Sequence, residues 1–116
     1  MSYQKTADII IKISKKTQDD LIEWETTERA GKYQVSFSNY SIRIFKSISN
    51  ETPGDDDYII QVINGYGETV EEVSDVDIKS LLPDAYKIMK NTYELARRKA
   101  MGVDEALDSI LDELDE

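Results

Sequence analysis

The residue types that most often carry catalysis are absent from this sequence. Its 116 residues include no histidine and no cysteine. Their absence excludes a histidine acid–base, imidazole or thiolate metal ligands, Ser-His-Asp or Cys-His catalysis, and disulfide bonds within these residues. Any chemistry would depend on carboxylates, hydroxyls and cations, and we predict neither an enzyme active site nor a bound cofactor.

Clustered carboxylates are the next candidates, for a metal ion or for acid–base chemistry. The three aspartates at 55–57 and the pair Asp75 and Asp77 supply oxygen ligands that a divalent cation prefers, but without EF-hand spacing. We interpret the triplet as solvated loop residues and the pair as the start of a helical turn. A working acid needs a buried carboxyl. The closest case is Glu23, which we place on the solvent side of an alternating segment, so we predict no metal site.

Phosphate and base recognition have only weak candidates. The cluster Arg97-Arg98-Lys99 could bind phosphate or an acidic partner, or complete the last turn of a helix. The segment 65–67 lacks the Gly-Lys-Ser/Thr ending of a phosphate loop and reads as a hairpin turn. Of the seven tyrosines, two fall in turns and are predicted to be exposed: Tyr40 and Tyr66. Four fall on apolar faces and are assigned to the core: Tyr33, Tyr58, Tyr86 and Tyr93.

The charge is negative and unevenly distributed. The formal net charge is −10; residues 1–50 carry eight Lys/Arg and six Asp/Glu, whereas residues 51–116 carry six and eighteen. Such a balance repels phosphate backbones, so we expect no direct nucleic-acid binding. It favours solubility, and it leaves open a nucleic-acid mimic or a partner for a basic protein.

Length and composition predict a single domain spanning 1–116. The chain is 40% hydrophobic, which suffices for one core. No run approaches the roughly 20 apolar residues of a membrane span, and the first residues lack the apolar core of a signal peptide, so we expect a cytoplasmic protein away from membranes.

The first predicted element is a helix over 4–23, with Thr6 as its N-cap. Ile9, Ile11 and Ile13 alternate as in a strand, but the wider spacing also fits a helix. The absence of glycine and proline over some 20 residues favours the helix, and residues 9–13 stay open between the two.

Period-two patterns then predict a β-meander over 24–73 with four or five strands. A short edge strand follows Trp24, and alternating segments cover 33–37, 41–48, 58–63 and 68–73. Residues 49–57, with Pro53-Gly54, read as a loop.

Two helices are predicted at the end, over 82–101 and 104–114, with Gly102 stopping the first and Asp104 capping the second. The second has the clearest amphipathic pattern in the chain. Its apolar stripe would be a liability if left exposed, so it must dock on the domain or on a partner. The predicted fold class is α+β: an N-terminal helix, an antiparallel meander, and two C-terminal helices packed on one face.

Residues 95–107 read Leu-Ala-Arg-Arg-Lys-Ala-Met-Gly-Val-Asp-Glu-Ala-Leu. This segment resembles the C-terminus of small uncharacterised prokaryotic proteins with the pattern A-R-R-x-A-x-G-V-D-x-x-L before an acidic amphipathic tail. Those proteins also carry a tryptophan followed by a Tyr/Phe-rich meander. The resemblance implies a fold and no site residue.

Contact with proteins is the leading expectation for function, with a homodimer as one form of it. The expected interface residues are Val103, Leu107, Ile110, Leu111, Leu114, Arg97 and Arg98. One alternative is an acidic inhibitor or nucleic-acid mimic of the phage counter-defence or antitoxin type. Another is a small-ligand binder with a pocket between sheet and helices, lined by Trp24, Tyr86 or Tyr93.

Overall fold

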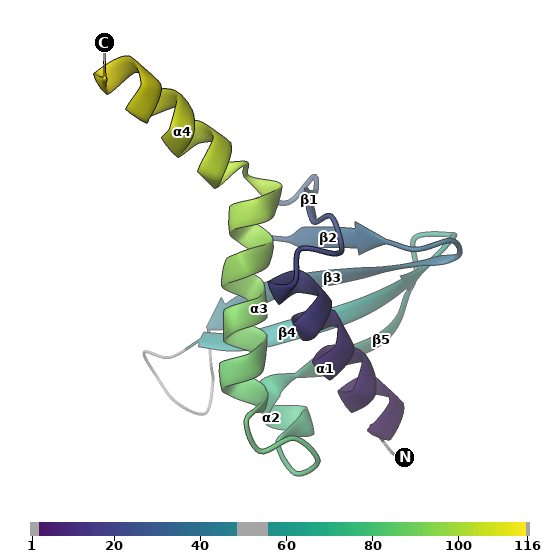
Figure 1. Ribbon diagram of the computed structural model, residues 1–116. Helices are drawn as coiled ribbons and strands as arrows, with labels where there is room; N and C mark the ends of the chain where they lie inside the picture. Colours follow the sequence, from purple (N-terminus) through teal and green to yellow (C-terminus); the bar gives the residue numbers. More distant parts are fainter. Residues whose placement is uncertain (1–2, 49–55, 116) are drawn as a thin grey trace.

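The computed structural model describes residues 3–48 and 56–115 (Figure 1). The elements in chain order are α1 Gln4–Gln18, β1 Glu25–Thr26, β2 Tyr33–Ser36, β3 Tyr40–Ile48, β4 Asp56–Asn64, β5 Thr69–Ser74, α2 Asp75–Ile78, α3 Ala85–Ala100 and α4 Val103–Leu114. The predicted α+β class, with an N-terminal helix, an antiparallel meander and C-terminal helices, is confirmed.

The five strands form one sheet in the order β1-β2-β3-β4-β5, with every neighbouring pair antiparallel. The register pairs Ile44 with Ile60 across β3 and β4. Both side chains are fully buried, because alternate residues of each strand turn toward the helices. The intervening residues face the other side of the sheet, where the Arg43 Nε–H donates to the Gln34 side chain at 2.7 Å.

Helix α1 includes residues 9–13, which settles the open choice in favour of a helix. Ile10 and Ile13 are buried whereas Ile9 and Ile11 are exposed, as helical spacing requires. Two boundary predictions were wrong. The N-cap is Tyr3 rather than Thr6, and the helix ends at Gln18 rather than at 23.

The early end of α1 has a local cause. Asp20 adopts a left-handed conformation, with φ +58°, and the Leu21 N–H then donates to the Lys16 carbonyl at 2.9 Å. This bond satisfies one of the last carbonyls and turns the chain toward β1. Aspartate takes this conformation more readily than most non-glycine residues.

The loop predicted at 49–57 lies mostly outside the described residues, including Pro53, Gly54 and Asp55. Its last two residues are not loop. Asp56 and Asp57 begin β4, where they pair with Ile48 and Ser47 of β3. The turn at 65–67 is confirmed: Gly67 has φ +82° and its N–H donates to the Asn64 carbonyl.

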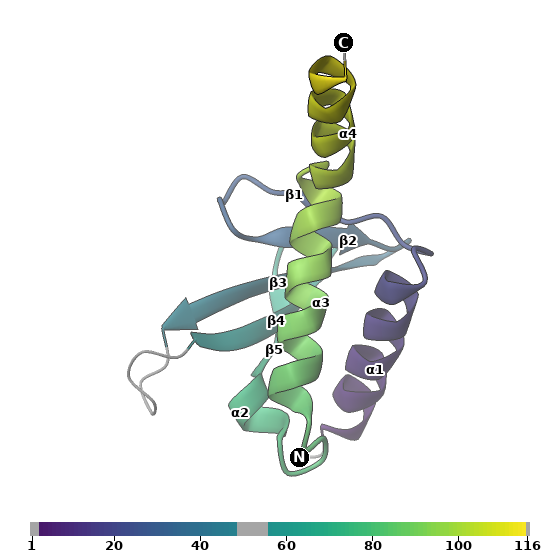
Figure 2. The ribbon, with the colours of Figure 1, turned by 60° about the vertical axis from the view of Figure 1, so that its left-hand side comes forward.

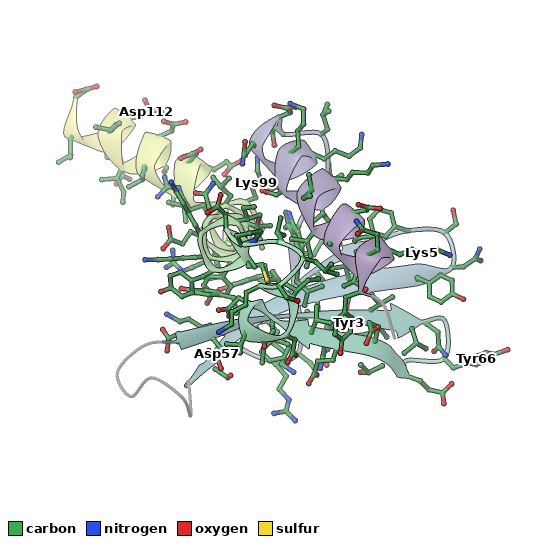
Figure 3. The ribbon with its side chains drawn as sticks, turned by 90° about the horizontal axis from the view of Figure 1, so that it is seen from below. Tyr3, Lys5, Asp57, Tyr66, Lys99 and Asp112 are labelled. Atoms are coloured by element: carbon green, nitrogen blue, oxygen red, sulfur yellow. The ribbon has the colours of Figure 1, made fainter. Side chains whose placement is uncertain are left out.

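Helices α1 and α3 lie side by side on one face of the sheet, and Figure 3 shows them above it. Helix α3 supplies the fully buried Ala85, Met89 and Ala96. The small alanines let its backbone approach the strands, and Met89 fills the space between them. The first turn predicted at 82 is not part of this helix, which begins at Ala85.

Helix α4 does not pack on the sheet, so the prediction of two C-terminal helices on one face was wrong for this element. It continues past the end of α3, beyond the sheet (Figures 1 and 2), and none of its residues is buried. Gly102, with φ +63°, separates the two helices and serves as the N-cap of α4 in place of Asp104.

Candidate protein-interaction surface

The α4 stripe is the set of apolar side chains on one side of this helix. Its members are Val103, Leu107, Ile110, Leu111 and Leu114. The last four are exposed by 47%, 53%, 55% and 73%. At about 100° per residue, all five fall within roughly a third of the helix circumference. The predicted interface residues of α4 therefore do share one face, and this face is uncovered by the described residues of the chain.

Acidic residues surround the α4 stripe. Val103–Leu114 contains five carboxylates and no lysine or arginine. Asp108 lies next to Leu111 on one edge, and Glu113 lies on the other edge. In Figure 3 Asp112 lies on the projecting helix, away from the sheet. The helix thus offers an apolar strip between two negative margins.

The two arginines predicted for the interface differ in their ion pairs. The Arg98 guanidinium donates to Asp104 Oδ1 at 3.1 Å, which joins the end of α3 to the start of α4. Both arginines line a hollow against the sheet together with Tyr58 and Tyr93. Arg98 therefore links α3 to α4, whereas Arg97 forms no ion pair among the described residues.

A second apolar surface lies between α1 and the sheet, and the sequence did not predict it. We call it the α1 groove. It is a hollow of about 420 Å³ whose lining is almost entirely apolar. Its lining residues are Ile9, Lys12, Ile13, Lys16, Ile22, Phe37, Tyr40, Ile42 and Val62. Phe37 and Tyr40, both half exposed, flank the β2–β3 turn. Two aromatic residues this close together at a turn were the available signal of an exposed apolar patch.

Two of the three alternatives predicted to line a ligand pocket, Trp24 and Tyr93, line separate hollows. Trp24 lines a polar hollow of about 420 Å³ near the ion pair between Lys99 and Asp20, whereas Tyr93 lines a different one. The indole itself is buried, and its Nε1–H donates to the Thr17 hydroxyl at 3.0 Å. Trp24 therefore serves the core.

The tyrosines assigned to the core form a cluster of rings. Tyr58 packs against Tyr93 and Tyr86 with ring centroids 5.6 Å apart in both pairs, and Tyr33 lies 5.7 Å from Tyr93. Burial raises the pKa of the Tyr58 phenol to about 12. The assignment of Tyr86 to the core was wrong, because this edge ring is 43% exposed. Tyr40 and Tyr66 are exposed as predicted.

The buried carboxylate is Asp75, not the residue that the sequence singled out. Glu23 is exposed, whereas Asp75 is buried at the start of α2 and accepts the Tyr58 backbone N–H at 2.7 Å. Burial raises the pKa of the Asp75 carboxyl, and the Tyr58 N–H opposes part of that rise. Ser74 and Asp77 form a capping box, so the predicted helical turn is confirmed.

Asp75 does not belong to a metal-ligand cluster among the described residues. Across residues 3–48 and 56–115, no three carboxylates come close enough together to hold a metal ion. Asp55 lies outside that part of the chain, and Asp56 pairs instead with Lys46 at 3.6 Å. Asp75 therefore joins β4 to α2 and acts as a structural acceptor.

None of the helices in the described residues has the length and apolar character that crossing a bilayer requires. No protein-family model, curated protein or solved structure matches the chain. The resemblance of residues 95–107 to small prokaryotic proteins therefore stays a prediction.

Proposed function

We propose that this chain is a protein-binding domain whose contact element is α4. The observation that carries the proposal is the α4 stripe: four large aliphatic side chains, each about half exposed or more, on a helix without a buried residue. Contiguous apolar surface of this kind on a folded domain marks an interaction site. No catalytic role is part of the proposal.

The chemistry of α4 specifies the kind of partner. An amphipathic helix binds by laying its apolar face in a hydrophobic groove, with anchors at i, i+3, i+4 and i+7. Leu107, Ile110, Leu111 and Leu114 have that spacing. Because five carboxylates surround them, the complementary groove is apolar with lysine or arginine at its rim.

The strength of such a contact can be bounded. Fully burying one such side chain gains about 1.5–3 kcal/mol, so completing the burial of four half-exposed ones gains roughly 3–6 kcal/mol. Association costs on the order of 4–15 kcal/mol in lost freedom. One stripe in one groove is therefore a weak contact, and a stable complex needs a second contact formed at the same time.

Photo-crosslinking from α4 tests this proposal. A photoreactive amino acid at position 107, on the stripe, is compared with one at 112, on the acidic side. We expect one discrete cross-linked protein from position 107 only, lost when Leu111→Asp is added. Equal cross-linking from both positions, or cross-linking that Leu111→Asp leaves unchanged, would overturn the proposal.

An acidic mimic is the second candidate, favoured by the five carboxylates and absent cations of Val103–Leu114. A mimic of a phosphate backbone binds through charge, so its affinity falls steeply as salt rises. The affinity of a complex formed through the α4 stripe falls only modestly as salt rises. A salt series on the cross-linked pair, with Leu107→Asp and Asp112→Asn as matched variants, separates the two: the mimic is weakened more by Asp112→Asn.

A further inference from the structure

We infer that the α1 groove is the receptor for α4, and that the α4 which occupies it belongs to a second copy of this chain. The inference rests on the proposed function and names its partner.

The lining of the α1 groove matches what the α4 stripe requires. Ile9 and Ile13 form one wall on α1, and Ile42 and Val62 form the floor on the sheet. Phe37 closes the far side and is half exposed. A leucine or isoleucine entering this hollow would contact only carbon atoms over most of its surface, as in a protein core.

The charges at the rim are complementary to α4. Helix α1 carries four lysines and one aspartate, the opposite balance to α4. Lys12 and Lys16 border the groove one helical turn apart, and neither forms a salt bridge within the described part of the chain. Asp108 borders the α4 stripe beside Leu111. An ion pair between Asp108 and one of these lysines can therefore form beside the docked stripe.

The lengths also agree. The α1 residues that line the groove run from Ile9 to Lys16, and the anchors of α4 run from Leu107 to Leu114. Each segment is eight residues of helix, about 10–12 Å long. The whole anchor set fits along the groove without overhang.

The groove is out of reach of the α4 of its own chain. Helix α1 lies between α3 and the β2–β3 turn, which carries Phe37 and Tyr40 (Figure 1). Helix α4 leaves from the far end of α3, after a two-residue link at Met101 and Gly102, and points away from α1 (Figure 2). To reach its own groove it would have to cross over α1, so a second copy is the nearer source.

Reciprocal docking of α4 between two copies explains how the dimer can be stable. Each copy has one α4 stripe and one α1 groove, so two copies related by a two-fold axis fill both grooves at once. The apolar area removed from water doubles, whereas the loss of rotational and translational freedom is incurred once. This supplies the second simultaneous contact that a single docked helix lacks.

Sedimentation equilibrium of the full chain tests the inference. Wild type should have about twice the 13.3 kDa mass of one chain. Phe37→Asp, in the groove, and Leu111→Asp, on α4, should each raise the dimer dissociation constant by at least about tenfold. Tyr66→Asp is the matched control, because Tyr66 is an exposed ring in a turn outside the groove. Phe37 is half exposed, so an unchanged circular-dichroism spectrum well below the melting transition will show that the groove variant still folds.

Charge reversal gives a sharper test, because it predicts a rescue. Lys12→Glu with Lys16→Glu should weaken the dimer about tenfold. Asp108→Lys, added to the same chain, should restore part of the lost affinity. A dimer that survives Phe37→Asp, or a charge pair that shows no rescue, would overturn the inference.

Two outcomes separate this inference from the proposed function. A chain that stays monomeric at roughly millimolar concentration, while position 107 still cross-links to a different protein, sinks the inference and leaves the proposed function standing. A monomer in which the amides of α4 are protected from hydrogen exchange means that α4 reaches its own groove, which overturns the inference as well. Loss of every cross-link that depends on the α4 stripe would overturn both the inference and the proposed function.

Discussion

Helices α3 and α4 follow one another with a single glycine stop between them, yet they differ completely in burial. Both are amphipathic, and the α4 stripe is the clearer of the two in the sequence. Helix α3 buries five residues, among them Met89 and Tyr93, whereas α4 buries none. An apolar stripe therefore indicates that a helix packs against another surface. It does not indicate whether that surface belongs to the same chain or to another one.

The physical reason lies in what faces each helix. Helix α3 crosses β2, β3 and β4, whose inward side chains are buried against it, and Ala85 and Ala96 allow close approach. Helix α4 begins after Gly102 and extends beyond the sheet, and the described part of the chain buries none of its residues. The same periodicity therefore yields a core element in one place and an unpartnered face in the other.

The largest effect is expected from a core truncation, measured by urea unfolding at a concentration too low for association. Ile60→Ala should cost about 2–5 kcal/mol, because Ile60 is fully buried and the sheet cannot collapse around the cavity. Leu111→Ala, on α4, should cost no more than about 0.5 kcal/mol. If the two losses were equal, α4 would be part of the folded body and the contrast between the helices would fail.

A buried hydrogen bond should have the next largest effect. The Thr17 hydroxyl accepts from the Trp24 Nε1–H at 3.0 Å and donates to the Ile13 carbonyl at 2.6 Å. Thr17→Val keeps the shape but leaves the indole N–H buried without a partner, which costs about 1–3 kcal/mol. The fluorescence of the one tryptophan should follow the unfolding transition. Thr17→Ser retains the hydroxyl and should lower the free energy of unfolding much less than Thr17→Val does.

The stability of the body should depend on pH through Asp75. Burial raises the pKa of this carboxyl above its unfolded value, so its favourable contribution is complete at low pH and is lost as pH rises through the folded-state pKa. The free energy of unfolding of wild type minus that of Asp75→Asn should therefore fall from about pH 3.5 to pH 7. Asp112→Asn, on α4, is the control. A difference that grows with pH would contradict this assignment.

The smallest effect concerns the join between the two helices. Arg98→Ala removes the 3.1 Å ion pair with Asp104, which is solvent exposed and worth about 0.2–1 kcal/mol. We expect little change in global unfolding and faster hydrogen exchange in the first turn of α4. Arg97→Ala is the control, since Arg97 forms no ion pair among the described residues. Equal exchange in both variants would show that the pair does not hold α4.

Most of the fold could be predicted from local patterns, because each strand is short and alternates cleanly. Tyr33 and Val35 face the helices while Gln34 does not, and the glycines at 65 and 67 mark the hairpin. Helix boundaries were less predictable. Nothing in the local pattern says that Asp20 will adopt the left-handed conformation that ends α1 early.

Of the two candidate surfaces, only the α4 stripe could be predicted from the sequence. The α4 stripe is contiguous in sequence, so its spacing alone identified Leu107, Ile110, Leu111 and Leu114. The α1 groove draws residues from α1, the β2–β3 turn and β4, as far apart as Ile9 and Val62. No local period joins such residues, and its two lysines look like any exposed pair until the fold places them at a rim.

By itself, the sequence determined the class of the fold, the absence of histidine and cysteine chemistry, and an acidic amphipathic helix at the end of the chain. These follow from composition and from periods of two and 3.6 residues, which depend only on neighbours along the chain. Only the tertiary structure decided that Asp75 is buried, that α4 projects uncovered, and that an apolar groove with two lysines opens beside α1. Those facts depend on distances between residues remote in sequence, which are set when the helices pack on the sheet.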